Sequence, residues 1–553
     1  MTQSKVPWWK TATGYQIYPR SFCDSNGDGI GDIPGITSKL DHLRDLGIGF
    51  IWLSPVYCSP MRDNGYDISD YYEIAPEFGT LADFDEMVAQ AKALGIRIVM
   101  DLVVNHCSSD HPWFQAACAL DDCPENDFFY WREPGPDGGP PDDQRSCFGG
   151  SAWTWVEAVG KYYFGFFGPQ QPDLNWQNPS LRHSIYDMMN WWLDRGIGGF
   201  RMDVIELIGK DIDARHYYEG PDMHRFIQEM NQETFARRDV LTVGESGAVT
   251  AQNALDYCGR DRGELNMMHG FNHIHAAWHP EKGRFGPNHF DLVTHKRILA
   301  GWQAALADDG WNSLFLSNHD LPRPVSAYGD EGRYRQRSAK MLAMVTYLMK
   351  GTPFLFQGEE IGMTNIAFDQ IDQFQDIETL GQYRDLIAAG GSEAEFIAAA
   401  NRNGRDNART PMQWNGIEHA GFTHGTPWMG VNPNYREINV TKDRRDPSGV
   451  FAFYQDLIAL RTNSAALRAG AFELCLPTHS QVFAYKRYID EECLYIIANF
   501  SGSDAIFECP DGLTQSAEVT LTSVDTPIEI AETMAFGPFQ ACVFRESALK
   551  DCV

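Results

Sequence analysis

The strongest constraint on this chain is an alternation of short apolar runs with segments of helical periodicity. Between the runs, apolar residues recur at helical spacing, as with Leu40, Leu43 and Leu46 ahead of Gly47. Alternating strands and helices predict a parallel sheet with right-handed crossovers. A count of eight strands favours a closed (β/α)8 TIM barrel over an open doubly wound sheet. The predicted strands are 15–18, 50–55, 96–106, 198–205, 240–245, 264–268, 312–318 and 353–357.

Two stretches depart from this alternation. Residues 107–171 are rich in Gly, Pro, Asp and aromatic residues, and an irregular excursion of this length indicates a functional insert or a small domain. After a final helix at 450–468, short strands and turns predict a C-terminal antiparallel β-sandwich. We therefore predict a barrel over 1–106 and 172–470, an inserted domain over 107–171, and a C-terminal β domain over 471–553.

Polar residues cluster where the predicted strands end. Active sites of parallel barrels lie at the C-terminal ends of the strands. Carboxylates held together from three strands repel one another, so stability does not explain them. Two such carboxylates suit glycoside hydrolysis, one as nucleophile and one as general acid and base. An arginine can keep the nucleophile ionised, and histidines can bind sugar hydroxyls. The residues concerned are Asp101, Asn105, His106, Arg201, Asp203, Glu245, His319 and Asp320.

Four segments carry a family resemblance: 101–106 (DLVVNH), 199–203 (GFRMD), 243–245 (VGE) and 317–320 (SNHD). In this order they resemble the signature regions of the α-amylase superfamily of retaining glycosidases, over nearly the whole chain. The resemblance implies Asp203 as nucleophile, Glu245 as general acid/base and Asp320 as the carboxylate that stabilises the transition state. It also implies that His106, Arg201 and His319 surround the bound glucose, and that 107–171 is the family's domain B.

Finer features resemble the oligo-1,6-glucosidase and dextran glucosidase group. The segment 63–67 (DNGYD) is similar to its pocket-forming segment, so that Asp63 would bind the terminal glucose and Tyr66 would stack beneath it. Arg405 would pair with Asp63 and close the site into a pocket, which implies exo action. Gln171 would shape the same pocket. Two further residues, Lys282 and Glu378, either contact the next sugar or are solvated surface charges.

Val204, directly after the expected nucleophile, resembles the residue found in relatives that prefer α-1,6 bonds. We therefore expect an exo-acting α-glucosidase that removes terminal α-1,6-linked glucose from isomalto-oligosaccharides or short dextrans. The alternatives of the same fold are an α-1,4-glucosidase, a trehalose-6-phosphate hydrolase and a sucrose isomerase. A non-catalytic carbohydrate-binding relative is the alternative from another class. Segments 246–248 and 266–273 depart from the family pattern and leave the leaving-group preference open.

The loop 24–32 has the spacing DxNxDGxGD, in which alternating oxygen donors can wrap a hard cation. It is not an EF-hand, because its twelfth position is Gly35 and not a bidentate Glu. The family resemblance supports a structural Ca²⁺ or Mg²⁺, and no organic cofactor is expected. The candidate ligands are Asp24, Asn26, Asp28, the Ile30 carbonyl and Asp32.

The net charge of −30 argues against nucleic acid or an anionic membrane as a partner. The first residues lack the apolar core of a signal peptide, and no run of 18 apolar residues occurs. The twelve cysteines show no metal-binding spacing and are typical of free cytosolic thiols. These features predict a cytoplasmic protein. The family resemblance implies a small oligosaccharide as its ligand, and we expect a monomer or a weak homo-oligomer.

Overall fold

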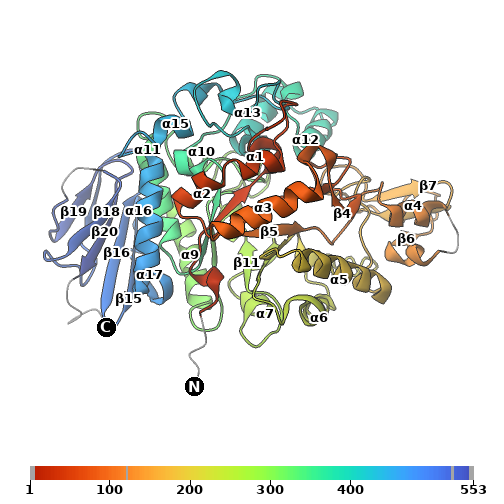
Figure 1. Cartoon of the computed structure of the whole chain (residues 1–553), viewed down its shortest axis with the longest axis horizontal. Helices are drawn as coiled ribbons and strands as arrows, with labels where there is room; N and C mark the ends of the chain where they lie inside the picture. Colours follow the sequence, from red (N-terminus) through yellow and green to blue (C-terminus); the bar gives the residue numbers. More distant parts are fainter. Residues whose placement is uncertain (1–5, 120–122, 525–527, 547–553) are drawn as a thin grey trace.

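The computed structural model describes residues 6–119, 123–524 and 528–546. Figure 1 shows three parts along the long axis of the molecule. The barrel occupies the middle, the segment with α4, β6 and β7 projects at one end, and the C-terminal strands form the other end.

Among the described residues, eight parallel strands form one sheet in the order β11-β10-β9-β5-β2-β1-β13-β12. The sheet confirms the predicted barrel class. Nearly every strand residue is buried, because helices cover the outer face and side chains fill the interior. The bounds are β1 Gly14–Ile17, β2 Phe50–Leu53, β5 Arg97–Leu102, β9 Gly199–Met202, β10 Leu241–Ser246, β11 Met267–Gly270, β12 Ser313–Phe315 and β13 Thr352–Phe356.

Four of these strands differ from their predicted bounds by three residues or more at one end. The strand expected over 198–205 ends at Met202, so Asp203 and Val204 follow it. The strand expected over 96–106 ends at Leu102, so Asn105 and His106 lie in the loop beyond it. The strand expected over 312–318 ends at Phe315, and β11 starts at Met267 instead of residue 264. Asn105, His106 and the residues after Phe315 therefore lie in loops at the barrel mouth, where no sheet pairing constrains their side chains.

The two edge strands, β11 and β12, meet through side chains. No ladder joins them among the described residues. Instead, the Ser313 hydroxyl donates to the carbonyl of Met268 at 2.8 Å and lies 2.9 Å from Nδ1 of His269. The barrel is therefore closed at this β11–β12 junction by one hydroxyl and not by backbone pairing.

The helices follow the predicted alternation, with local differences. Thr80 and Asp83 form a reciprocal capping box at the start of α3. The predicted stripe of Leu40, Leu43 and Leu46 lies on α2, which ends at Gly47, and α6 gives way to a π turn after Met230. The main helices are α1 Ile33–Thr37, α2 Leu40–Leu46, α3 Leu81–Ala93, α5 Pro179–Asp194, α6 Met223–Met230, α9 Leu292–Ala305, α11 Arg335–Tyr347, α12 Ile377–Ala388, α13 Glu393–Asn403 and α16 Val450–Asn463.

The segment after β5 forms a small unit of its own. Helix α4 (Pro112–Ala119) packs near a three-stranded antiparallel sheet made of β6 (Trp131–Arg132), β8 (Lys161–Phe164) and β7 (Trp153–Val156). Its core is aromatic, since the ring of Phe114 stacks on Trp131 and meets Tyr163 edge-on. Bridges from His106 to Asp173 and from Phe129 to Leu174 return the chain to the barrel mouth.

The C-terminal strands form a five-stranded antiparallel sheet beside a two-stranded one. Lys296 on α9 ties this part to the barrel: its Nζ donates to the carbonyls of Leu476, His479 and Val482 at 2.7, 2.7 and 2.9 Å. The strands are β14 Ala471–Cys475, β15 Val482–Ile489, β16 Glu492–Asn499, β18 Glu518–Thr522 and β20 Ala541–Glu546, with β17 Ala505–Glu508 paired to β19 Thr533–Phe536.

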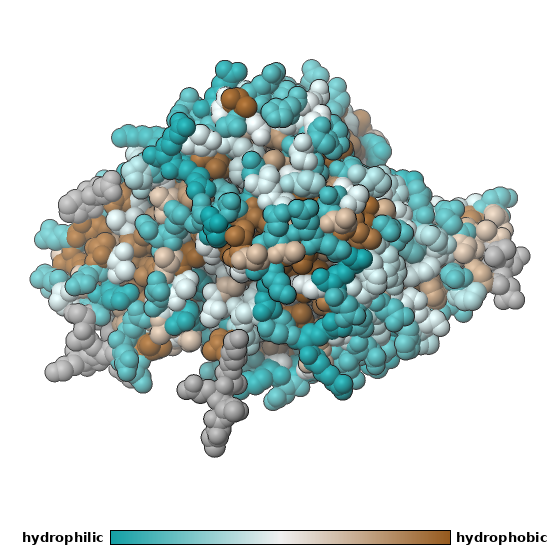
Figure 2. Space-filling model, viewed as in Figure 1, coloured by the Kyte–Doolittle hydropathy of each residue, from teal (hydrophilic) through white to brown (hydrophobic). Residues whose placement is uncertain are grey.

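The face drawn in Figure 2 is mostly hydrophilic, as expected of a strongly acidic chain. Hydrophobic side chains gather on the end formed by the C-terminal strands, where Ile506 is 69% exposed. Among the described residues, no helix has the length and apolar character needed to cross a membrane.

Candidate active site

A cavity of about 280 Å³ lies at the C-terminal ends of the barrel strands. It gathers residues from β10, the loops after β2, β5, β9, β11 and β12, and the segment around residue 405. Seven of the ten predicted catalytic and sugar-binding residues line it: Asp63, Tyr66, His106, Asp203, Glu245, Asp320 and Arg405. The other three, Gln171, Arg201 and His319, lie behind this wall and contact the residues that form it.

Arg201 joins three carboxylates beneath the cavity. Its Nη1 donates to Oδ1 of Asp101 at 2.8 Å and to Oδ1 of Asp203 at 2.9 Å, and its Nη2 pairs with Glu245. All four side chains are almost fully buried. The sequence suggested that Arg201 keeps Asp203 ionised. In the structure, Arg201 compensates the charges of three acids that would otherwise repel one another.

The two central carboxyls share an unusual environment. Burial and then the charge of Glu245 raise the pKa of Asp203 well above its usual range. Burial also raises the pKa of Glu245, although Arg201 opposes this effect. Two neighbouring buried carboxyls cannot both ionise easily, so the pair holds one proton near neutral pH.

Asp320 has the opposite character. Burial acts to raise its pKa, but His319, Arg405 and Arg409 outweigh burial and hold the pKa well below its usual range. Arg409 Nη2 donates to Oδ1 of Asp320 at 2.7 Å, and Arg405 Nη1 does so at 3.3 Å. Asp320 is therefore a fixed negative charge at the edge of the cavity, distinct from the proton-sharing pair.

Tyr66 forms an aromatic floor that rests on His319. The two rings are parallel within 5° with centroids 5.2 Å apart, and the Tyr66 hydroxyl donates to Oδ2 of Asp101 at 3.0 Å. Burial lowers the pKa of His319 to about 3. A neutral imidazole accepts or donates hydrogen bonds without adding charge, and Nδ1 of His319 lies 2.8 Å from Nε2 of Gln16.

Asp63, Gln171 and His106 form one polar wall. Gln171 Nε2 donates to Oδ2 of Asp63 at 2.9 Å and lies 3.2 Å from Nε2 of His106. Burial raises the pKa of Asp63 to about 7, against the lowering effect of Arg405. Burial lowers the pKa of His106 to about 3. Oδ1 of Asp63 accepts no hydrogen bond among the described residues and lies 3.5 Å from Nη2 of Arg405, so this oxygen can accept a hydrogen bond from a ligand.

Arg405 and Asp63 approach to 3.5 Å, but Arg405 has a closer partner. Its Nη2 lies 2.7 Å from Oδ1 of Asp376, the buried residue that caps α12. Arg409 also contacts Asp376, at 3.3 Å. Asp376 lies in an irregular polar stretch with no periodic pattern, so the sequence offered no signal for its role.

Lys282 is exposed and does not line the cavity, whereas Glu378 does. Glu378 Oε2 accepts from Arg284 at 2.8 Å and lies 3.4 Å from Nε of Arg405. Sequence reasoning also missed several residues that line the cavity. They are Phe166, Phe167, Glu206, Tyr218, Phe271, His275, Trp278 and Arg284.

Val204 lines the cavity with its backbone in the left-handed region, at φ 36° and ψ 46°. This conformation is costly for a β-branched residue, and such strain concentrates at functional sites. Its amide donates to Oε2 of Glu245 at 3.3 Å. The turn at Val204 therefore links the two carboxyls of the proton-sharing pair through the backbone.

The candidate cation loop is ordered by its own amides. Oδ1 of Asp24 accepts from Asn26 and Gly27, and its Oδ2 accepts from Gly29 and the Thr423 hydroxyl. Across the residues that the structure describes, no three His, Cys, Asp or Glu side chains are grouped to hold a metal ion. The carboxylate of Asp24 is thus occupied by amides and a hydroxyl in this conformation, whereas the predicted set also includes the Asn26 amide and the Ile30 carbonyl, and the metal stays a prediction.

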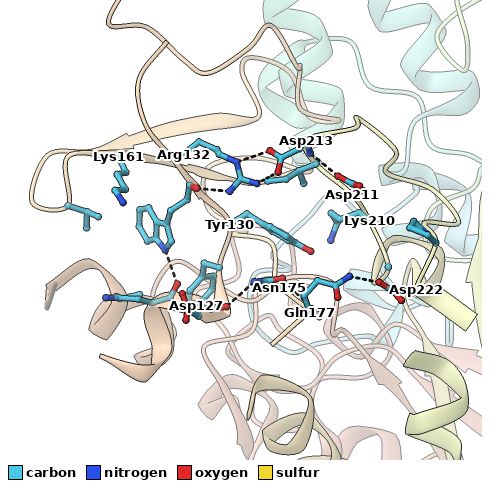
Figure 3. A pocket seen from close by; sticks show the side chains of 18 residues that line it. Asp127, Tyr130, Arg132, Lys161, Asn175, Gln177, Lys210, Asp211, Asp213 and Asp222 are labelled. Atoms are coloured by element: carbon cyan, nitrogen blue, oxygen red, sulfur yellow. Dashed lines mark hydrogen bonds and ion pairs between the residues drawn. The ribbon is translucent and has the colours of Figure 1, made fainter. Parts of the chain in front are cut away.

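A larger cavity of about 750 Å³ lies between the segment after β5 and residues 209–222. Asp203, Glu245 and Asp320 do not line it. Figure 3 shows its polar side chains paired across the gap, with Arg132 against Asp213 and Gln177 against Asp222. Lys210, on its wall, donates to Oδ1 of Asn105 at 2.7 Å and pairs with Asp173 at 3.0 Å. Lys210 thus holds the loop that carries His106.

Comparisons with known proteins agree with this geometry. The chain is 49% identical to an oligo-1,6-glucosidase of Halalkalibacterium halodurans and 49% identical to a palatinase of Erwinia rhapontici, with 97% of this chain and 98% of each relative covered. The structure of a trehalose-6-phosphate hydrolase of Bacillus licheniformis superposes with a TM-score of 0.93 at 43% identity, over 98% of this chain and 100% of that one. A family model described as "Alpha amylase, catalytic domain" matches residues 16–470, and the chain therefore belongs to the α-amylase family.

Proposed function

We propose that this enzyme is a retaining exo-α-glucosidase that hydrolyses terminal α-1,6 bonds of isomalto-oligosaccharides or short dextrans. The observation that carries the proposal is the convergence of Asp203, Glu245 and Asp320 on one small cavity. The cavity is bounded on one side by Asp63 and Arg405, which supports binding of a chain end and not of an internal segment.

The geometry supports a double displacement. Asp203 attacks the anomeric carbon while Glu245 donates the shared proton to the glycosidic oxygen, and Glu245 then activates water to release α-glucose. Asp203 and Glu245 contact the same guanidinium, which supports the short separation of about 5–5.5 Å typical of retaining enzymes. The fixed charge of Asp320 stabilises the positive charge that develops on the sugar ring.

The cations of the cavity disfavour a phosphorylated substrate. Among the residues that line it, all of them described, the arginines are Arg284 and Arg405. Arg284 is paired with Glu378 at 2.8 Å and Arg405 with Asp376 at 2.7 Å. A phosphate would have to displace one of these carboxylates. We therefore expect trehalose 6-phosphate to be a poorer substrate than isomalto-oligosaccharides.

Initial rates on isomaltose, panose, isomaltulose, maltose, sucrose and trehalose 6-phosphate test the proposal. Isomaltose and panose should give the highest kcat/KM, and proton NMR at early times should detect α-glucose as the first product. A preference for maltose or trehalose 6-phosphate contradicts the α-1,6 assignment, and β-glucose as first product contradicts retention.

We further propose a reducing, cytoplasmic location. All eleven cysteines that the structure describes are free thiols, which is typical of that compartment. A monomer or weak homo-oligomer remains our proposal for the assembly, and sedimentation velocity tests it.

A further inference from the structure

Glu206 is a buried carboxylic acid that the mechanism above does not use. It lies three residues after Asp203, in the short helical turn Ile205–Leu207, and is only 2% exposed. It nevertheless lines the active-site cavity, together with Glu245 and Gly247. A buried acid at this position needs partners for both oxygens, or it needs a ligand.

Only one of its oxygens has a partner. Oε1 accepts from the amide of Gly247 at 2.9 Å, whereas Oε2 is buried and has no hydrogen-bond partner among the residues that the structure describes. A buried carboxyl oxygen without a partner is costly, and in a ligand cavity a bound hydroxyl can remove that cost. The fixed Oε1 contact also holds the carboxyl in place, so Oε2 keeps one position.

The space around this group suits a second sugar. A Cβ built on Gly247 would meet nothing closer than Oε1 of Glu206 at 3.8 Å and Cε1 of His275 at 4.0 Å. Tyr218 lines the same cavity, is 45% exposed and packs edge-on against Phe166. An open wall, an exposed aromatic face and a carboxyl oxygen that can hydrogen-bond a hydroxyl match the amphipathic surface of a hexose.

We propose that Oε2 of Glu206 binds a hydroxyl of the leaving-group sugar, and that this contact makes Glu206 a specificity-determining residue for the acceptor side. The inference rests on the proposed hydrolysis of a disaccharide bond, because only then does a sugar occupy this space. It assigns Glu206 no covalent step. The residue acts by binding and orienting the sugar that departs with the proton of Glu245.

The test compares two substrates that share the glucosyl group. Isomaltose fills the acceptor side, whereas α-glucosyl fluoride leaves it empty. Glu206→Ala should lower kcat/KM on isomaltose about ten-fold while the value on the fluoride changes less than about two-fold. The isosteric Glu206→Gln, which keeps hydrogen-bonding groups, should recover most of the loss. A second readout is the KM for glucose as acceptor of glucosyl fluoride, which should rise in Glu206→Ala.

Glu219→Gln is the matched control, because Glu219 is close in sequence and bonds Asn253 and Tyr257 without lining the cavity. It should leave the isomaltose-to-fluoride ratio unchanged. Equal losses on both substrates, or no loss on isomaltose, would overturn the assignment. If the wild-type enzyme does not cleave isomaltose, the α-1,6 proposal is wrong, and the same ratio is measured with the disaccharide that it does cleave.

Discussion

Nη1 of Arg201 lies 2.9 Å from Oδ1 of Asp203, and the same nitrogen lies 2.8 Å from Asp101 on the neighbouring strand. Arg201 thus positions the proposed nucleophile, Asp203. It also positions Asp101, the carboxylate that accepts from the Tyr66 hydroxyl. Arg201 lies in β9 and Asp203 directly follows that strand, so the nucleophile is positioned by a residue of the sheet.

Replacing the two proposed catalytic carboxyls should have different consequences. Asp203→Asn should reduce turnover below about a hundredth of wild type, because no nucleophile remains. Glu245→Gln should slow isomaltose hydrolysis about 10²–10⁴-fold. With α-glucosyl fluoride, which needs no proton to depart, Glu245→Gln should accumulate a glucosyl adduct detectable by intact-mass spectrometry. An adduct that also forms on Asp203→Asn would contradict the assignment.

Asp376→Asn tests the buried anion that holds Arg405 and Arg409. Burial opposes its ionisation, but Arg405 and Arg409 outweigh burial and lower the pKa of Asp376 to about 2. Removing the charge leaves two buried cations undercompensated, and we expect a loss of about 3–5 kcal/mol in the free energy of unfolding. Chemical denaturation measures it. The exposed neighbour Asp372→Asn should lose less than about 0.5 kcal/mol, and similar losses in both variants would refute the idea.

Val204→Thr tests the basis of linkage preference. The two side chains are nearly isosteric, so the turn is retained while a hydroxyl replaces an apolar methyl group on the cavity wall. We expect the ratio of kcat/KM on maltose to that on isomaltose to rise about ten-fold. Paired rate measurements decide the matter, and an unchanged ratio would remove Val204 from the explanation of specificity.

Glu206 should make stability depend on pH. Burial first, and then Glu245 and Glu219, raise its pKa to about 8, against the Gly247 amide; Tyr218 and His275 are the other titratable groups beside it. The folded protein then holds a proton that the unfolded chain releases near its usual pKa of about 4.5. Stability from this group is therefore full below pH 4.5 and lost as pH rises through about 8.

Glu206→Gln removes that dependence. The difference in Tm between Glu206→Gln and wild type should grow in favour of the variant from pH 5 to pH 9. Calorimetry in buffers of matched ionic strength measures it. A difference that stays constant over this range would mean that Glu206 keeps an ordinary pKa.

Lys296→Met tests the connection between barrel and C-terminal sheet. The variant keeps the aliphatic stem but leaves the carbonyls of Leu476, His479 and Val482 without this donor. We expect a loss of about 1–3 kcal/mol in the free energy of unfolding with kcat unchanged. Lys282→Met, at an exposed position, is the control for loss of a positive charge. Equal stability of the two variants would contradict the role of Lys296.

The barrel and the three carboxylates could be predicted because strand periodicity is local and because barrel geometry brings strand ends together. Asp376 could not be predicted, since its contact with Arg405 joins two irregular segments. Glu206 resembles an ordinary surface charge in the sequence, and only the turn at Val204 buries it against Gly247. Asn105 and His106 fall within a predicted strand because the apolar run continues past Leu102, where sheet pairing stops.

The junction that Ser313 closes between β11 and β12 has a consequence for how rigid each wall of the site is. Asp203 follows β9 and Glu245 lies in β10, and both strands are paired on both sides. Phe271, His275 and Trp278 follow β11, which has a backbone ladder on one side only within the described part of the chain. Among the described residues, opening this edge breaks the two contacts of the Ser313 hydroxyl and ring contacts such as that of His269 with Phe315, but no ladder. The proposed nucleophile and general acid/base thus stand on or beside strands with a ladder on each side, whereas Asp320 and the wall after β11 follow strands with a single ladder. The two groups that make and break bonds to the sugar are therefore held more firmly than the walls around them.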